Sequence, residues 1–223
     1  MKQLEKLECC WVKRGVPRPK LRIMSEEEFL KIHNASIKLL EDVGVFIDNK
    51  EGLRSLEEAG ALVGGRRARI PRRIVEDALE RAPKTITIYD RDGAKYAELK
   101  PGGETLFAPG SAAVKILDYN STTPRPPALR DLVNIALIVE NLSSIKLQST
   151  AVIPVDVPIE HRDSIRLLPI LAFSSKPIVT GAFSDEGLIN MLKALSILRE
   201  DYADKPMAIF DVCPSPPLKW SYT

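Results

Sequence analysis

The sequence predicts an α/β protein in which a small α+β module precedes the first part of a (β/α)8 barrel of the TIM type. Two observations lead to this prediction. After residue 128, apolar strand-like runs alternate with helical segments, which favours parallel strands joined by helical crossovers. The last of these runs, 208–212, is almost continuously apolar, as is typical of a strand that is covered on both faces.

We divide the chain into a basic arm (1–24), an α+β module (25–104) and an incomplete barrel (105–223). A complete barrel needs eight strands and about 250 residues, so the last part is either a small open sheet or the beginning of a larger structure. A final strand in an open sheet would expose an unpaired edge. We therefore favour an interrupted barrel.

The module begins with a predicted helix, SEEEFLKIHNASIKLLEDVG (25–44). Ser25 and Glu28 have the spacing of a capping box, and Gly44 is a typical C-terminal stop. The apolar stripe expected to face the core consists of Phe29, Ile32, Ile37, Leu40 and Val43.

Four further elements complete the predicted module. NKEGLRSLEEAG (49–60) is a short helix, and ALVGGRRARI (61–70) is a hairpin that turns at its glycine pair. PRRIVEDALERAP (71–83) is a helix with proline at its first position, and TITIYDRDGAKYAEL (85–99) is a second hairpin.

The second part begins with LFAPGSAAVKILDY (106–119), which we interpret as two strands joined at ProGlySer, and continues with a helix over 126–142. A βαβαβ pattern follows. Pro169 should kink the helix 161–174. Ser184 should cap the helix 184–200, in which Gly187 is tolerated near the start. The strands are 145–153, 176–183 and 205–212, and the helices are 161–174 and 184–200.

Composition narrows the possible partners. The 32 basic and 30 acidic residues nearly cancel. The basic runs 13–22 and 64–73 lack the interleaved aromatic residues of a single-strand platform, so we expect no nucleic-acid ligand; an arginine-rich hairpin that binds nucleic acid is the alternative. No apolar run is long enough to span a membrane and no secretory signal is present, so we predict a cytoplasmic protein without a membrane partner.

The chain carries few residues for metal or nucleophile chemistry. Its three cysteines form no CxxC pair and it has two histidines, so we expect no metal site. There is no Gly-rich nucleotide-binding signature, and Ser111 lacks the surroundings of a nucleophile elbow. No catalytic residue is identified.

Candidate binding residues lie at the carboxyl ends of the predicted strands, where barrels place their active sites. Aromatic side chains with one carboxylate suit a cationic or zwitterionic small molecule held by cation–π attraction. Gly181 would allow close approach of a ligand, and Asp211 would either offset a cation or cap a neighbouring loop. The predicted substrate-binding residues are Gly181, Asp211, Cys213, Trp220, Pro109 and Gly110.

Five blocks of sequence occur in order: LLEDVGVFIDNKEGLRSLEEAGALV, RIPRRIVEDALERAPKTITIYDRD, LFAPGSAAVKILDY, SSKPIVTGAFS and MAIFDVCPSPPLKW. From about residue 25 to its end, the chain resembles the trimethylamine:corrinoid methyltransferase family. The resemblance implies a (β/α)8 barrel with an N-terminal α+β extension. It also implies methyl transfer, in methylamine metabolism and methanogenesis, from a methylated or quaternary amine such as trimethylamine or glycine betaine to the cobalt of a separate corrinoid protein.

The same resemblance implies that this chain binds no cofactor itself, because the corrinoid (cobalamin) is carried by the partner protein. Members are about twice as long, and the later barrel strands, with the position of pyrrolysine, fall outside this sequence. We therefore expect an enzyme, or the N-terminal portion of one that is inactive alone. The alternative is a non-catalytic fragment or scaffold that binds a partner chain supplying the missing strands; a homo-oligomer is a further expectation.

Overall fold

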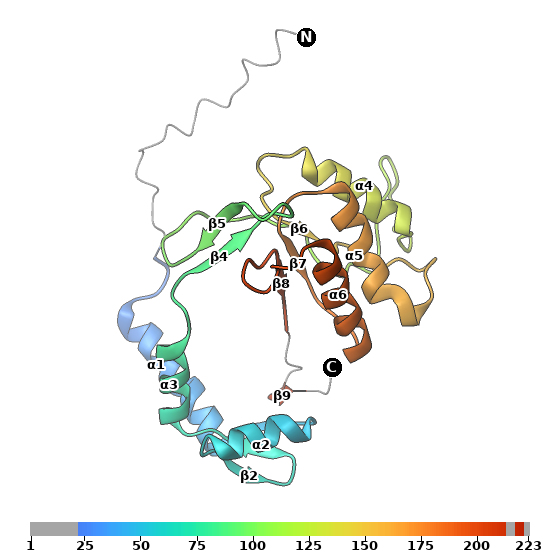
Figure 1. The fold of residues 1–223 in the computed structure, drawn as a ribbon. Coiled ribbons are helices and arrows are strands. Elements are labelled where there is room, and N and C mark those ends of the chain that lie inside the picture. The colour runs from blue at the N-terminus through green and yellow to red at the C-terminus, as the bar shows by residue number, and fades with distance from the viewer. Residues whose placement is uncertain (1–21, 213–216, 221–223) are drawn as a thin grey trace.

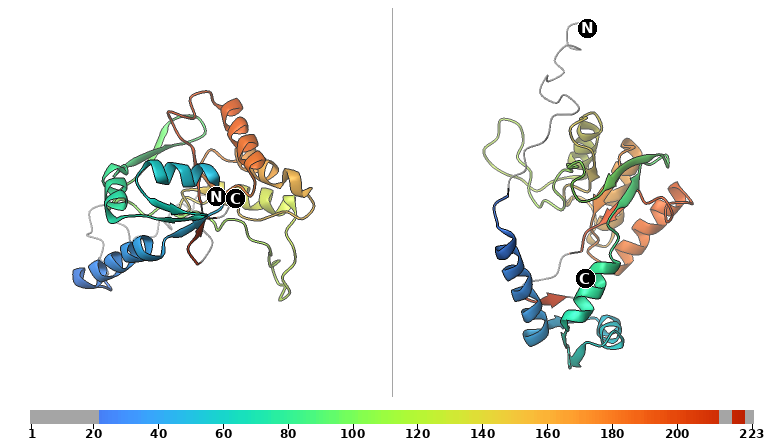
Figure 2. Two further views of the ribbon diagram at one scale, coloured as in Figure 1. Left: turned by 90° about the horizontal axis from the view of Figure 1, so that it is seen from below. Right: turned by 90° about the vertical axis from the view of Figure 1, so that its left-hand side faces the viewer.

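The computed structural model describes residues 22–212 and 217–220. The first helices and a small sheet lie at one end of the molecule, and a parallel sheet covered by helices lies at the other (Figure 1). A β-hairpin lies between these two parts. Figure 2 shows from two further sides that the last strand returns to the first sheet.

The first helix, α1 (Glu26–Lys38), begins with the predicted capping box. The Ser25 hydroxyl accepts a hydrogen bond from the Glu28 amide at 3.2 Å, and the Glu28 carboxylate accepts one from the Ser25 amide at 2.8 Å. A π-helical turn, η1 (Leu39–Val43), continues the helix to Gly44, which has a φ of 73°. The predicted start and stop of this helix are confirmed.

The apolar stripe of α1 was predicted to face the core, and for most of its length this prediction was wrong. Ile37 is buried, but Phe29 and Ile32 are more than half exposed and Val43 is exposed as well. The reason is that α1 packs along one side, where it contacts α3 (Arg72–Arg81). None of the described residues covers the rest of its apolar face.

A four-stranded sheet forms the centre of the N-terminal module. Its order is β2-β3-β1-β9, with β1 antiparallel to β3 and parallel to β9. The second helix, α2 (Lys50–Glu58), begins at the side-chain cap of Asn49, whereas Pro71 is the N-cap of α3 and not its first helical residue. The strands are β1 (Val45–Ile47), β2 (Leu62–Gly64), β3 (Arg67–Arg69) and β9 (Lys219–Trp220), and their core consists of Val45, Ile47, Ala61, Ala68 and Ile70.

The second predicted hairpin joins the two parts of the molecule. It consists of β4 (Ile86–Tyr89) and β5 (Lys95–Leu99), which pair in antiparallel register. The Tyr89 amide donates to the Pro206 carbonyl at 2.9 Å, and Arg199 Nη1 donates to the Asp90 carbonyl at 2.7 Å. These bonds attach the hairpin to the segments that precede β8 and follow α6.

The predicted βαβαβ pattern is confirmed, and the chain is an α/β protein. Its parallel sheet has the order β6-β7-β8, which does not close a barrel within the described residues. In the same described residues, no helix is long and apolar enough to cross a membrane. The elements are α4 (Leu129–Glu140), β6 (Gln148–Ser149), η2 (Ile159–His161), α5 (Arg162–Phe173), β7 (Ile178–Thr180), α6 (Asp185–Leu198) and β8 (Ala208–Phe210).

The segment 106–119 does not form the two strands predicted for it. It makes only isolated bridges, Ala113 to Val152 and Ile116 to Arg125. The guanidinium of Arg125 explains the irregular course, because it binds the carboxylates of Asp118 and Asp131 and so folds the segment back onto the start of α4.

The last strand of the parallel sheet, β8, is half-buried along its whole length. Ile178 and Ala208 are register partners on the face that packs into the main core with α4, α5 and α6. Val179 and Ile209 on the opposite face are only half-buried. The prediction that both faces of the last strand are covered is therefore not met here, because β8 is an edge strand within the described sheet.

A lysine closes the C-terminal end of α4. The Nζ atom of Lys176 donates to the carbonyl oxygens of Val139, Leu142 and Ile145 at 2.5, 2.8 and 2.8 Å. Val139 lies in the last turn of α4, and the carbonyls of Val139 and Leu142 also accept hydrogen bonds from the amides of Leu142 and Ile145. The ammonium group, with its three donors, therefore joins the end of the helix to the turns that follow it.

We predict that Lys176→Met lowers the free energy of unfolding by about 1.5–3 kcal/mol, the range for hydrogen bonds in which one partner is charged. Urea denaturation followed by circular dichroism measures the change. The matched control is Lys193→Met, which removes an exposed lysine from α6. Equal denaturation midpoints for the two variants would contradict this role of Lys176.

Candidate functional site

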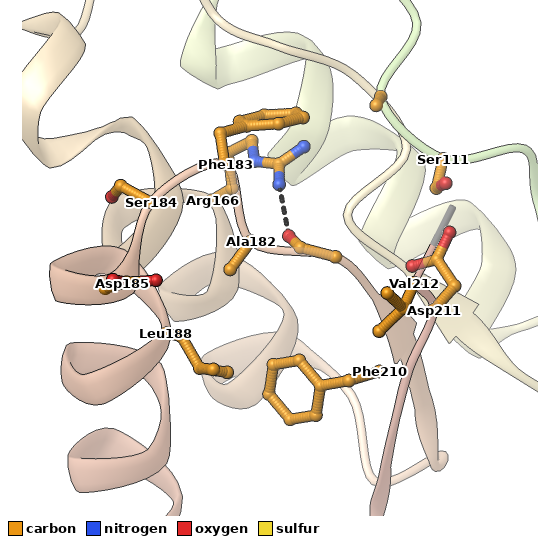
Figure 3. Close-up of a pocket in the computed structure, with 12 residues that line it drawn as sticks. Ser111, Arg166, Ala182, Phe183, Ser184, Asp185, Leu188, Phe210, Asp211 and Val212 are labelled. Atoms are coloured by element: carbon orange, nitrogen blue, oxygen red, sulfur yellow. Dashed lines mark hydrogen bonds between the residues drawn. The ribbon is translucent and has the colours of Figure 1, made fainter. Parts of the chain in front are cut away.

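A cleft of about 710 Å³ opens at the carboxyl ends of β7 and β8 (Figure 3). Its walls come from α5, the loop between β7 and α6, the first turn of α6, the extension of β8 and the irregular segment before α4. The residues that line it are Ser111, Ala112, Arg166, Gly181, Ala182, Phe183, Ser184, Asp185, Leu188, Phe210, Asp211 and Val212.

Gly181 and Asp211, two of the predicted binding residues, lie side by side in this cleft. The Asp211 amide donates to the Thr180 carbonyl at 2.9 Å, which continues the pairing of β7 with β8. A Cβ atom added to Gly181 would lie 2.9 Å from Oδ1 of Asp211. Gly181 therefore gives room to the Asp211 carboxylate, which makes no hydrogen bond or ion pair with the described residues.

A buried acidic side chain fixes the start of α6. Asp163 is 5% exposed, and its Oδ2 atom accepts hydrogen bonds from the Phe183 amide at 2.8 Å and the Ser184 hydroxyl at 3.4 Å. A Cβ atom on Gly187 would lie 2.2 Å from the same oxygen. Gly187, which the sequence marked as merely tolerated, is needed so that this carboxylate can reach the helix N-terminus.

Arg166 is the most deeply buried charged residue of the cleft, with 1% of its surface exposed. Its Nη2 atom donates to the Gly181 carbonyl at 2.8 Å and lies 3.6 Å from Asp163 Oδ1. Its guanidinium lies 4.5 Å from the centre of the Phe183 ring. Burial lowers the pKa of Arg166, while the negative charges of Asp163 and Asp211 act in the opposite direction.

Sequence reasoning did not identify Asp163 and Arg166. Both belong to α5, and a charged pair three residues apart normally indicates an exposed helix face. The available signal was Gly187, a glycine in the first turn of a capped helix, which indicates close approach of another group.

The other predicted site residues are separated from this pair. Trp220 lies in β9, where Ile47 is its partner in the N-terminal sheet, and it does not line the cleft. Pro109 and Gly110 immediately precede the cleft residue Ser111 but do not line the cleft themselves. The Gly110 carbonyl accepts a hydrogen bond from the Ser149 hydroxyl at 3.0 Å. Cys213 lies outside the described residues.

The cleft combines groups of three kinds. Asp211 contributes an exposed carboxylate, Arg166 a buried guanidinium, and Phe183 and Phe210 contribute aromatic rings. Aromatic faces and a carboxylate attract an organic cation, and the guanidinium attracts an anionic group. The arrangement is suited to binding a small cationic or zwitterionic molecule.

Comparison with known proteins gives consistent matches. The family model described as trimethylamine methyltransferase (MTTB) matches residues 3–223. The chain is 27% identical over 221 residues to trimethylamine methyltransferase MttB of Desulfitobacterium hafniense (strain DSM 10664 / DCB-2), a match that covers 93% of this chain and 43% of that protein. It is 26% identical over 207 residues to glycine betaine methyltransferase of D. hafniense (strain Y51), covering 91% and 43%.

A shorter match, 35% identical over 72 residues, is to proline betaine:corrinoid methyltransferase of Eubacterium limosum and covers 32% of this chain and 15% of that protein. The chain thus spans less than half the length of the curated relatives that it matches. The match to the family model includes nearly every residue of the sequence. The chain belongs to the trimethylamine methyltransferase (MTTB) family.

Proposed function

We propose that this chain forms part of a methyltransferase that moves a methyl group from a methylated or quaternary amine, such as trimethylamine or glycine betaine, to the cobalt of a corrinoid protein. The observation that carries the proposal is the cleft at the ends of β7 and β8, in which Asp211 and aromatic rings meet. Membership of the MTTB family supports the reaction class. The name of the E. limosum relative supports a corrinoid partner.

The proposed chemistry makes modest demands on this chain. A quaternary ammonium already carries a neutral amine as its leaving group, so displacement of that amine requires alignment and desolvation more than proton transfer. Asp211 would balance the charge of the bound cation, and Phe210 would exclude water beside it. The corrinoid of the partner protein would supply the cobalt that accepts the methyl group.

We further propose that residues 105–223 are the first part of a (β/α)8 barrel, preceded by the module 25–104 and the arm 1–24. The parallel sheet with helices on one face supports this proposal. The remaining strands would be added beside β8. They would cover Val179 and Ile209, which are half-buried here.

The open edge of β8 also favours the second candidate function, a scaffold that binds a partner chain carrying the missing strands. An edge strand presents unpaired backbone groups that pair readily with another chain. Under this alternative, any activity belongs to the assembly and not to this chain.

The proposed reaction can be tested by an assay of methyl transfer. The chain, alone and with the C-terminal half of a relative, is supplied with reduced corrinoid protein and a panel of methylamines and betaines, and formation of methylcobalamin is followed by absorbance. We expect Asp211→Asn to lower kcat/KM about tenfold, because the cation loses its counter-charge. The control is Asp92→Asn in the exposed turn between β4 and β5. Absence of methyl transfer in both preparations would refute the proposed function.

The scaffold alternative can be tested at the unpaired edge of β8. We expect the isolated chain to self-associate with rising concentration, as measured by light scattering after size exclusion. Ile209→Lys places a charge on the uncovered face of β8 and should restore a monomer. Ile197→Lys is the matched control, since Ile197 is 86% exposed on α6. A wild-type chain that stays monomeric at high concentration argues against the scaffold.

A further inference from the structure

The guanidinium of Arg166 is buried without a full set of partners. Among the described residues, its Nη2 atom binds the Gly181 carbonyl, whereas Nε and Nη1 have no hydrogen-bond partner. A buried charged donor that is left unsatisfied destabilises a protein, so such groups are uncommon outside functional sites. The two nitrogens are available to an acceptor that the fold itself does not provide.

Asp163, the carboxylate that forms an ion pair with Arg166, is already engaged elsewhere. Oδ2 of Asp163 is held by the Phe183 amide at 2.8 Å, and Oδ1 approaches Arg166 only to 3.6 Å. At this separation the contact is an ion pair but not a hydrogen bond. Asp163 therefore balances the charge of Arg166 without saturating its donors.

Charges of opposite sign face the same cleft from different elements. Arg166, from α5, and Asp211, which follows β8, both line the cleft (Figure 3). Asp185 and Asp211 both line the cleft. This surplus of carboxylates disfavours a ligand with two negative charges and favours one that carries a single carboxylate together with a cationic group.

The ring of Phe183 covers the guanidinium. The ring centre lies 4.5 Å from the Arg166 Cζ atom, and Phe183 is 47% exposed. A side chain that is half exposed can change its rotamer without disturbing the core. Rotation of Phe183 would remove its ring from the guanidinium.

We propose that Arg166 is a carboxylate-binding residue, covered by Phe183, that makes the cleft selective for zwitterions carrying a methylated ammonium and a carboxylate. The inference rests on the proposed function and specifies the substrate class of the same site. The carboxylate of the ligand accepts hydrogen bonds from the free nitrogens of Arg166, and its ammonium group lies toward Asp211. A planar guanidinium is well suited to a carboxylate because it can bind both oxygens at once.

The test is calorimetric titration of the chain with glycine betaine and with choline, which has the same trimethylammonium group but a hydroxyl in place of the carboxylate. We expect wild type to bind glycine betaine at least about tenfold more tightly than choline. Arg166→Gln should weaken glycine betaine binding about 10- to 100-fold more than it weakens choline binding. The matched control, Arg162→Gln, removes an arginine of the same helix that binds the Val157 carbonyl outside the cleft.

Phe183→Ala provides a second measurement in case Arg166→Gln does not fold. It leaves Arg166 in place, so the preference for glycine betaine over choline should equal or exceed that of wild type. The proposal is overturned if wild type binds neither ligand or binds both equally, if Arg166→Gln weakens both to the same extent, or if Phe183→Ala abolishes the preference.

These outcomes are distinct from those of the methyl-transfer assay. Selective binding of glycine betaine without methyl transfer would support the role of Arg166 and refute the proposed reaction. Methyl transfer without a preference for glycine betaine over choline would support the proposed reaction and refute the role of Arg166.

Discussion

The arrangement of the cleft depends on one buried carboxylate. Asp163 holds the backbone where the loop after β7 becomes α6, and it reaches that place only because Gly187 has no side chain. One turn further along α5, Arg166 holds the Gly181 carbonyl at the end of β7. Since the first contact fixes the helix and the second fixes the strand, the loop that carries Phe183 is anchored at both ends. A charge buried for this purpose is costly unless paired, which explains why the acid and the guanidinium occur together.

A second constraint comes from the path of the chain after β8. The Phe46 amide donates to the Leu218 carbonyl at 2.9 Å, and the Asp48 amide donates to the Trp220 carbonyl at 3.0 Å. These bonds draw β9 into the N-terminal sheet, parallel to β1. Trp220 therefore lies in the N-terminal sheet and does not line the cleft. Trp220 was predicted to line the cleft because it follows the last predicted strand of the parallel sheet. Its actual position is determined by the pairing of β9 with β1.

The parts of the fold that could be predicted have local causes. The Ser25–Glu28 capping box, the stop at Gly44 and the cap at Ser184 each depend on residues within one helical turn, and all three are present. The pairing of Gly181 with Asp211 followed from the rule that parallel strands end at one edge of a sheet. The exposure of most of the α1 stripe and the identity of Asp163 as the group beside Gly187 could not be predicted, because each depends on which distant element packs there.

Burial varies along the face of the parallel sheet that lies opposite the helices. On that face Ser149 of β6 is fully buried, beneath the segment whose Gly110 carbonyl it binds, while Val179 of β7 and Ile209 of β8 are half-buried. Beside β6, the sheet continues through the bridge between Ala113 and Val152. Only the β8 edge is free in the described sheet, and Asp211 follows directly from it. A strand added at this edge would lie beside Asp211, so we expect it to change the affinity of the cleft for a ligand, and by linkage the ligand would change the affinity for that strand equally.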